Sequence, residues 1–198
     1  MTVAVLDLGY GNTGSVQLAL QRAGAEAELT ADPVRLAQAS HVVLPGVGAA
    51  GYASRRIAET GIAEPLRALT QPVLGVCLGM QLMFERSEED DAPGLGIFPG
   101  AVTRLEPAPG RPVPHMGWSR LALHADAPGL ADGDYVYFAH SYAAAPGPET
   151  VATADYGGPV PAIVAKANWT GVQFHPERSG EAGARFMAAW LGQEGHGA

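Results

Sequence analysis

The chain has 198 residues, of which 47% are hydrophobic and 16% are charged; this fits a single domain spanning residues 1–198 and excludes an intrinsically disordered chain. Its formal net charge of -8, without a basic cluster, argues against nucleic acid and against an anionic membrane surface as the main partner. No apolar run is long enough to span a membrane, and the first residues lack the pattern of a secretory leader, so we expect a cytoplasmic protein that binds a small molecule or another protein.

The first half of the chain alternates strand and helix patterns. The expected strands are residues 2–8, 27–30, 41–44 and 73–76, and the expected helices are residues 16–23, 33 onward and 78–85. Asp32 and Pro33 are the expected N-cap and first residue of the second helix. Strands that are apolar throughout and alternate with helices are typical of a parallel sheet covered on both faces.

The second half is divided differently, because prolines and glycines separate short strand-like runs from Gly94 onward. The expected strands are residues 135–139, 150–154, 163–165 and 171–174, which indicates mixed or antiparallel pairing. We interpret the Met-Gly-Trp segment after His115 as a turn and the acidic segment 87–91 as a solvated loop. A last helix over residues 179–191 carries apolar side chains on one stripe, which predicts packing against the sheet.

Cys77 is the only cysteine, and it lies where an apolar strand meets a helix. Gly75 and Gly79 flank it at the spacing of a nucleophile elbow, a strained turn that only small neighbours accommodate. Its sulfur would lie over a helix N-terminus, where the reactive thiolate is favoured. A buried cysteine in an ordinary strand-to-helix turn is the alternative, and these residues alone leave it open.

A cysteine nucleophile needs a proton acceptor, and His175 has the best context among the six histidines. Pro176 would keep the backbone extended, so that His175 and Glu177 point the same way and the carboxylate fixes the imidazole tautomer. A surface His-Pro-Glu turn is the alternative, and His140 could line the same cleft. The remaining histidines are interpreted as structural or solvated: His41, His115, His124 and His196. The histidine spacings match no zinc site, so we expect no metal.

The Pro-Gly-Val-Gly segment from Pro45 to Gly48 follows the third expected strand. Loops at the carboxyl ends of parallel strands gather at one edge of a sheet, so this segment would lie beside Cys77 and its backbone amides could stabilise an oxyanion. A plain turn is the alternative. Neither this segment nor the earlier Gly-Tyr-Gly-Asn segment matches a phosphate-binding loop.

Taken together, these residues resemble class I glutamine amidotransferases, whose nucleophile lies in Cys-x-Gly-x-Gln and whose base lies in His-Pro-Glu. Within that family the chain is similar to the glutaminase subunits of imidazole glycerol phosphate synthase, from histidine biosynthesis. Six segments carry this resemblance, in order over nearly the whole length: DLGYGNTGSV, LPGVG, GVCLGMQLMFERSEE, HMGW, YFAHSY and GVQFHPERSG.

The resemblance implies a three-layer α/β fold with a mostly parallel central sheet, helices on both faces and a smaller antiparallel portion in the C-terminal half. It implies that L-glutamine is the substrate, that no cofactor is needed, and that a cyclase subunit forms a heterodimer with this chain and receives ammonia. The implied catalytic triad is Cys77, His175 and Glu177. The implied oxyanion residues are Val47, Gly48 and Leu78, and the implied substrate-binding residues are Gly46, Gln81, Glu89, Ser141 and Tyr142. The residues that the resemblance places at the partner interface are Asn12, Met116, Trp118, Tyr137 and Arg178.

Several positions depart from the family's usual residues, among them Leu8, Thr13, Ser119 and Arg178, where Tyr, Leu, Asn and Lys are common. They concern the partner interface and leave the triad intact. Three other interpretations stay open on the sequence: the glutaminase of another class I amidotransferase, a catalytically silent regulatory module that binds a partner, and a cysteine peptidase. GYGN, HMGW and YFAHSY argue against the first, the complete triad against the second, and Gln81 with Glu89 against the third.

Overall fold

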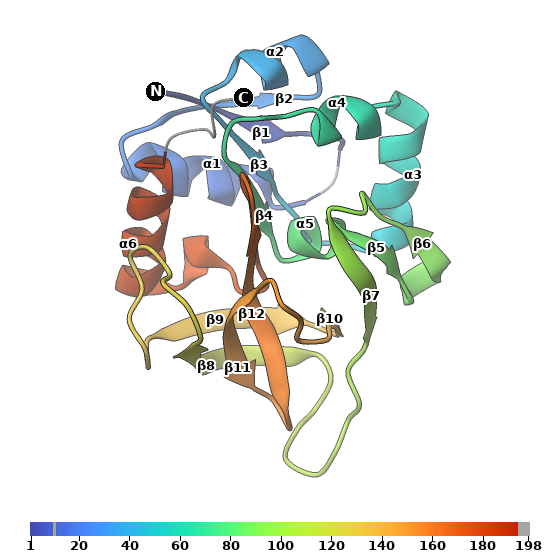
Figure 1. The fold of residues 1–198 in the computed structure, drawn as a ribbon, viewed down its shortest axis with the longest axis vertical. Helices are drawn as coiled ribbons and strands as arrows, with labels where there is room; N and C mark the ends of the chain where they lie inside the picture. Colours follow the sequence, from blue (N-terminus) through green and yellow to red (C-terminus); the bar gives the residue numbers. More distant parts are fainter. Residues whose placement is uncertain (10, 194–198) are drawn as a thin grey trace.

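The computed structural model describes residues 1–9 and 11–193, and its main feature is a nine-stranded sheet (Figure 1). The strand order is β2-β1-β3-β4-β13-β12-β11-β8-β9. In chain order the strands are β1 (Thr2–Leu6), β2 (Glu26–Thr30), β3 (His41–Leu44), β4 (Val73–Val76), β8 (His115–Leu123), β9 (Tyr135–His140), β11 (Thr150–Asp155), β12 (Pro159–Lys166) and β13 (Trp169–Val172). The sheet is parallel from β2 to β13 and antiparallel from β13 to β9. The expected strands are all present, although several ends differ by a few residues.

Helices cover both faces of the parallel half. They are α1 (Thr13–Arg22), α2 (Pro33–Gln38), α3 (Ala50–Thr60), α4 (Ala63–Arg67), α5 (Leu78–Gln81) and α6 (Gly180–Leu191), with short 3-10 turns η1 (Glu89–Asp91) and η2 (Pro176–Arg178). Side chains of α1 and α6 share one apolar core with Val3 and Val5, whereas α2, α3 and α4 share the other with Ala4 and Leu6. Successive strand residues point to opposite faces, so β1 contributes to both cores. The fold is the expected three-layer α/β arrangement.

A smaller second sheet has the order β10-β7-β5-β6 and lies beside the large one (Figure 1). Its strands are β5 (Phe84–Ser87), β6 (Ala92–Pro93), β7 (Phe98–Arg104) and β10 (Tyr142–Ala144). Strand β9 ends at His140 and β10 begins at Tyr142, so the chain passes from one sheet to the other at Ser141.

The helix predicted over residues 78–85 is wrong in its second half, where β5 begins. The carbonyls of residues 82–84 accept hydrogen bonds from the amides of residues 95–98, and the Phe84 and Phe98 ring centroids lie 5.5 Å apart. Leucine, methionine and glutamate favour helix only weakly, and this long-range pairing overrides that preference.

The turn predicted after His115 is also wrong, because the Met-Gly-Trp segment belongs to β8. Gly117 pairs with Phe138 of β9 and has a φ of 135°, in the left-handed region that favours glycine. The glycine that suggested a turn therefore allows an irregular strand to continue.

Helix α3 was not predicted, because it has no local start signal. Its N-cap, Ala49, offers no side-chain hydrogen bond. Instead Oε2 of Glu89 accepts a hydrogen bond of 2.7 Å from the Ala50 amide, from 39 residues further along the chain. Glu88, Asp90 and Asp91 are exposed, as expected, whereas Ser87 is buried at the end of β5 and the half-buried Glu89 caps a helix.

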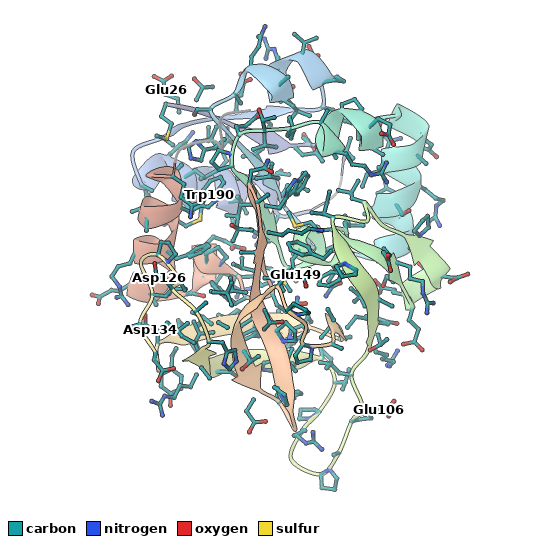
Figure 2. All side chains as sticks on the ribbon, viewed as in Figure 1. Glu26, Glu106, Asp126, Asp134, Glu149 and Trp190 are labelled. Atoms are coloured by element: carbon teal, nitrogen blue, oxygen red, sulfur yellow. The ribbon has the colours of Figure 1, made fainter. Side chains whose placement is uncertain are left out.

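Glu26 and Glu106 lie near opposite ends of the long axis of the molecule, whereas Trp190 points inward from α6 (Figure 2). Trp190 is buried, and its ring meets that of His41 edge-on at 4.9 Å. The predicted packing of the last helix against the sheet is therefore confirmed. Within residues 1–9 and 11–193, no helix has both the length and the apolar character needed to cross a bilayer.

Candidate active site

Cys77 occupies a sharp turn between β4 and α5. Its φ of 52° and ψ of -106° lie outside the regions that non-glycine residues usually adopt, as a nucleophile elbow requires. The Cys77 amide donates to the Val172 carbonyl at 2.7 Å, which ties the turn to β13. Because α5 has only four residues, its N-terminus favours an anion less than the longer helix predicted from the sequence.

Close backbone packing around the elbow explains its glycines. A Cβ on Gly79 would lie 1.9 Å from the Leu44 carbonyl oxygen, and one on Gly46 would lie 2.4 Å from the Gly79 amide nitrogen. A Cβ on Gly75 would lie 2.6 Å from Met83 Cε. The loop after β3 therefore lies directly against the elbow, and Gly46, which the resemblance assigns to substrate binding, lies within this contact.

His175 and Glu177 form a buried pair beside Cys77. The His175 Nδ1 atom lies 2.9 Å from Glu177 Oε1, and the two side chains are 4% and 2% exposed. The Cys77 side chain interacts with the His175 ring and raises its pKa, and Nε2 is the ring atom left to face the sulfur. The backbone reason given from the sequence is wrong, because Pro176 opens the 3-10 turn η2 and does not continue an extended segment. The turn brings the carboxylate back to the ring.

The environment of His175 favours its protonated form. Burial alone lowers the pKa of an imidazole, but here the hydrogen bonds and charges of Cys77 and Glu177 outweigh burial and raise the pKa of His175 to about 10. The ring therefore holds a proton at neutral pH, which is the form that can protonate a leaving group. Glu177 Oε2 is buried without a hydrogen-bond partner among the described residues.

Two buried residues that the sequence did not single out support this pair. The Gln173 amide group donates to Cys77 Sγ at 3.6 Å and accepts from Gln81 Nε2 at 3.1 Å. The Ser179 hydroxyl donates to the His175 carbonyl at 2.7 Å and accepts from the Tyr137 amide at 2.9 Å. Gln173 lies two residues before His175, just after β13, and this spacing was the available signal; Ser179 offered none.

A cavity of about 190 Å³ opens beside Cys77. It gathers the predicted oxyanion residues and most of the predicted substrate residues: Val47, Gly48, Leu78, Gln81, Glu89, Ser141 and Tyr142. Pro114, Ala139 and His140 also line it, whereas Gly46 does not. The sequence anticipated His140 here and missed Pro114 and Ala139, because nothing local indicates that the ends of β8 and β9 reach the elbow.

The polar side chains of the cavity are held by specific contacts. Gln81 Nε2 donates to the Tyr142 carbonyl at 2.8 Å, so the helix after the elbow is tied to the small sheet. The Glu89 carboxylate is shared with the start of α3, through Ala50. The Arg104 guanidinium lies 5.9 Å from the centre of the Tyr142 ring.

Most of the predicted interface residues form one cluster at the surface, on and beside strands β8 and β9 at one edge of the large sheet. Met116 and Trp118 are 64% and 54% exposed. Trp118 meets Tyr137 edge-on at 6.0 Å, and the Arg178 guanidinium lies 4.6 Å from the centre of the same Tyr137 ring. Asn12 is the N-cap of α1, and its side chain makes no capping hydrogen bond. The residue before it, Gly11, lies close to Gly46 in the loop after β3.

The other histidines take structural positions. The His115 and His140 side chains are buried and hydrogen-bonded to each other, and His41 is buried against α6. His124 is exposed, as expected, and contacts Thr153 at 2.9 Å. His196 lies outside the described residues.

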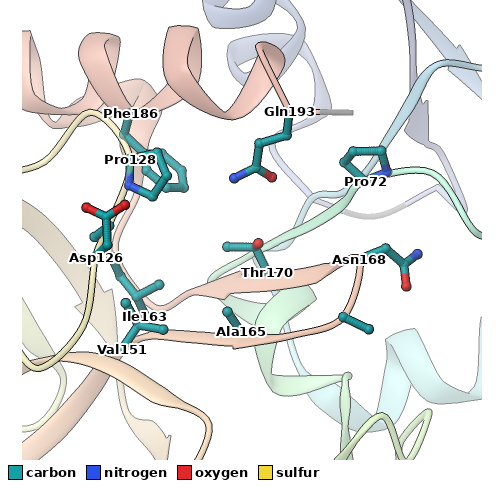
Figure 3. Close-up of a pocket in the computed structure, with 12 residues that line it drawn as sticks. Pro72, Asp126, Pro128, Val151, Ile163, Ala165, Asn168, Thr170, Phe186 and Gln193 are labelled. Carbon is teal, nitrogen blue, oxygen red and sulfur yellow. The ribbon is translucent and has the colours of Figure 1, made fainter. Parts of the chain in front are cut away.

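A larger hollow, of about 390 Å³, lies between the C-terminal end of α6 and the segment around Asp126 (Figure 3). Phe186, Ile163 and Val151 make much of its wall apolar, and Asp126 is its charged residue. It contains neither a nucleophile nor a histidine. The smaller cavity beside Cys77 is therefore the candidate active site.

Comparisons with known proteins agree with this geometry. Residues 4–191 match the family model described as glutamine amidotransferase class-I. A relative from Xylella fastidiosa, named imidazole glycerol phosphate synthase subunit HisH, is 50% identical over 192 residues, covering 96% of each chain. A relative of the same name from Xanthomonas axonopodis pv. citri is 47% identical over the same share of each chain.

Solved structures support the fold. A crystal structure described as glutamine amidotransferase superposes with a TM-score of 0.75 at 22% identity, covering 96% of this chain and 99% of that one. The structure of PurLQS from Thermotoga maritima superposes with a TM-score of 0.71 at 20% identity, covering 96% and 97%. With the family match over residues 4–191, these findings show that the chain belongs to the class I glutamine amidotransferases.

Proposed function

We propose that this chain is the glutaminase subunit of an imidazole glycerol phosphate synthase. It hydrolyses L-glutamine to glutamate and ammonia, and the ammonia passes to a cyclase subunit in histidine biosynthesis. The interaction of the buried His175 with Cys77, which itself lines the small cavity, supports the chemistry. Relatives that are 47% to 50% identical and bear the name of that synthase's subunit support the pathway.

In the proposed reaction, Cys77 Sγ attacks the side-chain carboxamide carbon of glutamine after His175 has taken the thiol proton. The tetrahedral oxyanion is held by backbone amides of the loop after β3 and of Leu78. Protonated His175 then gives its proton to the departing nitrogen, and ammonia leaves a thioester on Cys77. Water activated by His175 hydrolyses the thioester to glutamate. Glu177 orients the imidazole and stabilises its charged form throughout.

Glutamine recognition is assigned to the far wall of the cavity. The Glu89 carboxylate suits the α-ammonium group by charge, and Ser141 and Tyr142 supply polar groups for the α-carboxylate end. Gln81 supports the wall through its bond to the Tyr142 carbonyl. A free amino acid fits this combination better than a peptide does, because a peptide lacks the free ammonium group at an internal residue.

The exposed cluster of Met116, Trp118, Tyr137 and Arg178 is the proposed contact surface for the cyclase subunit. Aromatic, methionine and arginine side chains are enriched at protein interfaces. The Tyr137 amide bonds Ser179, which in turn bonds the His175 carbonyl, so this surface is continuous with the backbone that carries the proposed base.

Glutamate release by the purified chain, measured with and without the cyclase subunit from the same genome, tests the proposal. We expect slow release by the chain alone and an increase of at least about tenfold in the complex, because a single misplaced oxyanion donor costs about a hundredfold or more. Equal rates would defeat the proposed coupling. A chain without glutaminase activity, whose Cys77 also resists a glutamine-like electrophile in the complex, would be a silent binding module.

A further inference from the structure

A chain of hydrogen bonds runs behind the cavity wall, through two buried histidines that the proposed mechanism does not use. The Ser119 hydroxyl lies 2.9 Å from His115 Nε2, and His115 Nδ1 lies 3.0 Å from His140 Nε2. His140 Nδ1 lies 2.8 Å from the Tyr142 carbonyl oxygen. This series of hydrogen bonds therefore leads from β8, next to the exposed Trp118, to Tyr142, which lines the cavity.

The direction of this chain follows from one fixed end. A carbonyl oxygen only accepts, so His140 must carry a proton on Nδ1, and in a neutral ring Nε2 is then left as an acceptor. His115 Nδ1 must then donate to it, which leaves His115 Nε2 to accept from the Ser119 hydroxyl. While both rings are neutral, every donor in this series of hydrogen bonds meets an acceptor only when both rings carry the proton on Nδ1.

The surroundings keep both rings neutral. His115 and His140 are 2% and 5% exposed. His115 stacks between the rings of Phe138 and Tyr156, at centroid distances of 4.7 and 3.9 Å. Burial is the main reason that the pKa of each histidine is lowered to about 4. At His140 the bond to the Tyr142 carbonyl opposes this shift, and the charges of His115 and His175 add to it.

The hydrogen-bonded series ends where the backbone passes from the large sheet to the small one through a single residue, between β9 and β10. Ser141 is the residue between β9 and β10, and both Ser141 and Tyr142 line the cavity. The Tyr142 carbonyl accepts from His140 Nδ1 and from Gln81 Nε2, each at 2.8 Å, so both of its lone pairs are used. The position of this peptide depends on the His140 proton.

We propose that His115 and Ser119 are positioning residues for substrate recognition, acting through His140 to hold the Ser141–Tyr142 wall of the cavity in its binding geometry. This inference rests on the proposed function in one respect, that the occupant of the cavity is glutamine. It also assigns a role to Ser119, whose hydroxyl supplies the donor that begins this series of hydrogen bonds.

The first test reads the tautomers directly. Nitrogen-15 NMR of the histidine side chains at neutral pH should show His115 and His140 protonated on Nδ1, although free neutral imidazoles favour Nε2. The His115→Asn variant, whose amide can replace the Nδ1 donor, should leave His140 in the same form. An Nε2-protonated His140 in the unmodified chain would overturn the proposal. This readout does not depend on activity, so it stays decisive even if the proposed glutaminase function fails.

The second test measures glutamine kinetics in the complex with the cyclase subunit. His115→Leu leaves the His140 acceptor without a donor, and we expect the KM for glutamine to rise roughly tenfold while kcat falls less than about threefold. His115→Asn should restore most of the affinity. A purely structural role would lower the thermal midpoint without this separation of KM from kcat, and an unchanged KM in folded His115→Leu would overturn the proposal.

The Ser119 pair gives a milder version that should not disturb folding. Ser119→Ala should raise KM roughly twofold to threefold and weaken the Nδ1 preference of His115, because Nε2 loses its donor. Ser119→Asn should restore both properties. Equal KM values for the alanine and asparagine variants, with unchanged tautomers, would exclude Ser119 from the chain.

Discussion

The parallel and antiparallel halves of the large sheet contribute to the site in different ways. The parallel half fixes Cys77 through its backbone: a positive φ, and glycines at places where neighbouring carbonyls and amides leave no room for a Cβ. In the antiparallel half, side-chain hydrogen bonds hold the site: His115 of β8 bonds His140 of β9, His140 bonds the Tyr142 carbonyl, and the Tyr137 amide of β9 donates to Ser179 at the start of α6. The close-packed glycines around Cys77 leave no room for added atoms. The side-chain hydrogen bonds of the antiparallel half can accept a side chain of another shape, provided that it still supplies the donor.

Removing the nucleophile should have the largest effect on activity. Cys77→Ala takes away the attacking sulfur, and we expect glutaminase activity to fall by at least about four orders of magnitude. Synthesis with added ammonium salt should continue in the complex, because the cyclase subunit does not need this sulfur. Residual glutamine hydrolysis within about tenfold of the unmodified complex would contradict the assigned role of Cys77.

Substitutions at two glycines test whether close backbone packing restricts the parallel half. Gly79→Ala places a Cβ 1.9 Å from a carbonyl oxygen, and we expect the free energy of unfolding to fall by about 3 kcal/mol or more. The matched control is Gly14→Ala in α1, where no atom lies within 4 Å of the new Cβ. That variant should change stability by no more than about 1 kcal/mol and should favour the folded state. Urea unfolding of both variants distinguishes a packing constraint from a general loss of glycine.

The role of hydrogen bonds in the site is tested first at the pair of His175 and Glu177. Glu177→Gln keeps the size of the side chain but removes the charge that helps to raise the pKa of His175 to about 10. We expect this pKa to fall, measured by NMR titration of the ring, and kcat to fall about a hundredfold. Protonated His175 serves as the acid, so activity is lost when rising pH removes its proton. In the variant, we expect this alkaline loss of activity to begin at a lower pH. An unchanged titration would show that Glu177 does not act through charge.

Acid should destabilise the antiparallel half through its buried histidine pair. The folded pKa values of His115 and His140 are about 4, below the ordinary value of 6.5, so the unfolded chain binds more protons between these limits. The free energy of unfolding should therefore fall by about 2 kcal/mol or more as pH decreases from 6.5 to 4. His115→Asn should make this decline shallower. Equal pH dependence in the two proteins would contradict the lowered pKa of His115.

The sequence predicted the site better than it predicted the small sheet. Cys77, Gly75 and Gly79 were recognisable because a strained elbow restricts nearby residue types. Strand β5 was not, since Phe84 lies in a segment of helix-favouring residues and becomes a strand only through pairing with the segment near Phe98. The predictable parts depend on local backbone geometry, and the unpredictable parts depend on partners far along the chain.

The same limit applies within the site. His175 and Glu177 could be paired from their spacing, although the turn at Pro176 that joins them is not the extended backbone expected. Glu89 caps α3 from 39 residues along the chain, and the Ser179 hydroxyl bonds the His175 carbonyl across the turn η2; no sequence pattern indicated either contact.

The crossing at Ser141 has a consequence for how such an enzyme can change. Cys77 and His175 follow neighbouring strands of one sheet, while Tyr142 belongs to the other sheet and Glu89 directly follows one of its strands. A slight tilt between the two layers would widen or narrow the cleft without altering the spacing of sulfur and imidazole. Ligand preference and chemical reactivity can therefore diverge separately, each within its own layer of the protein.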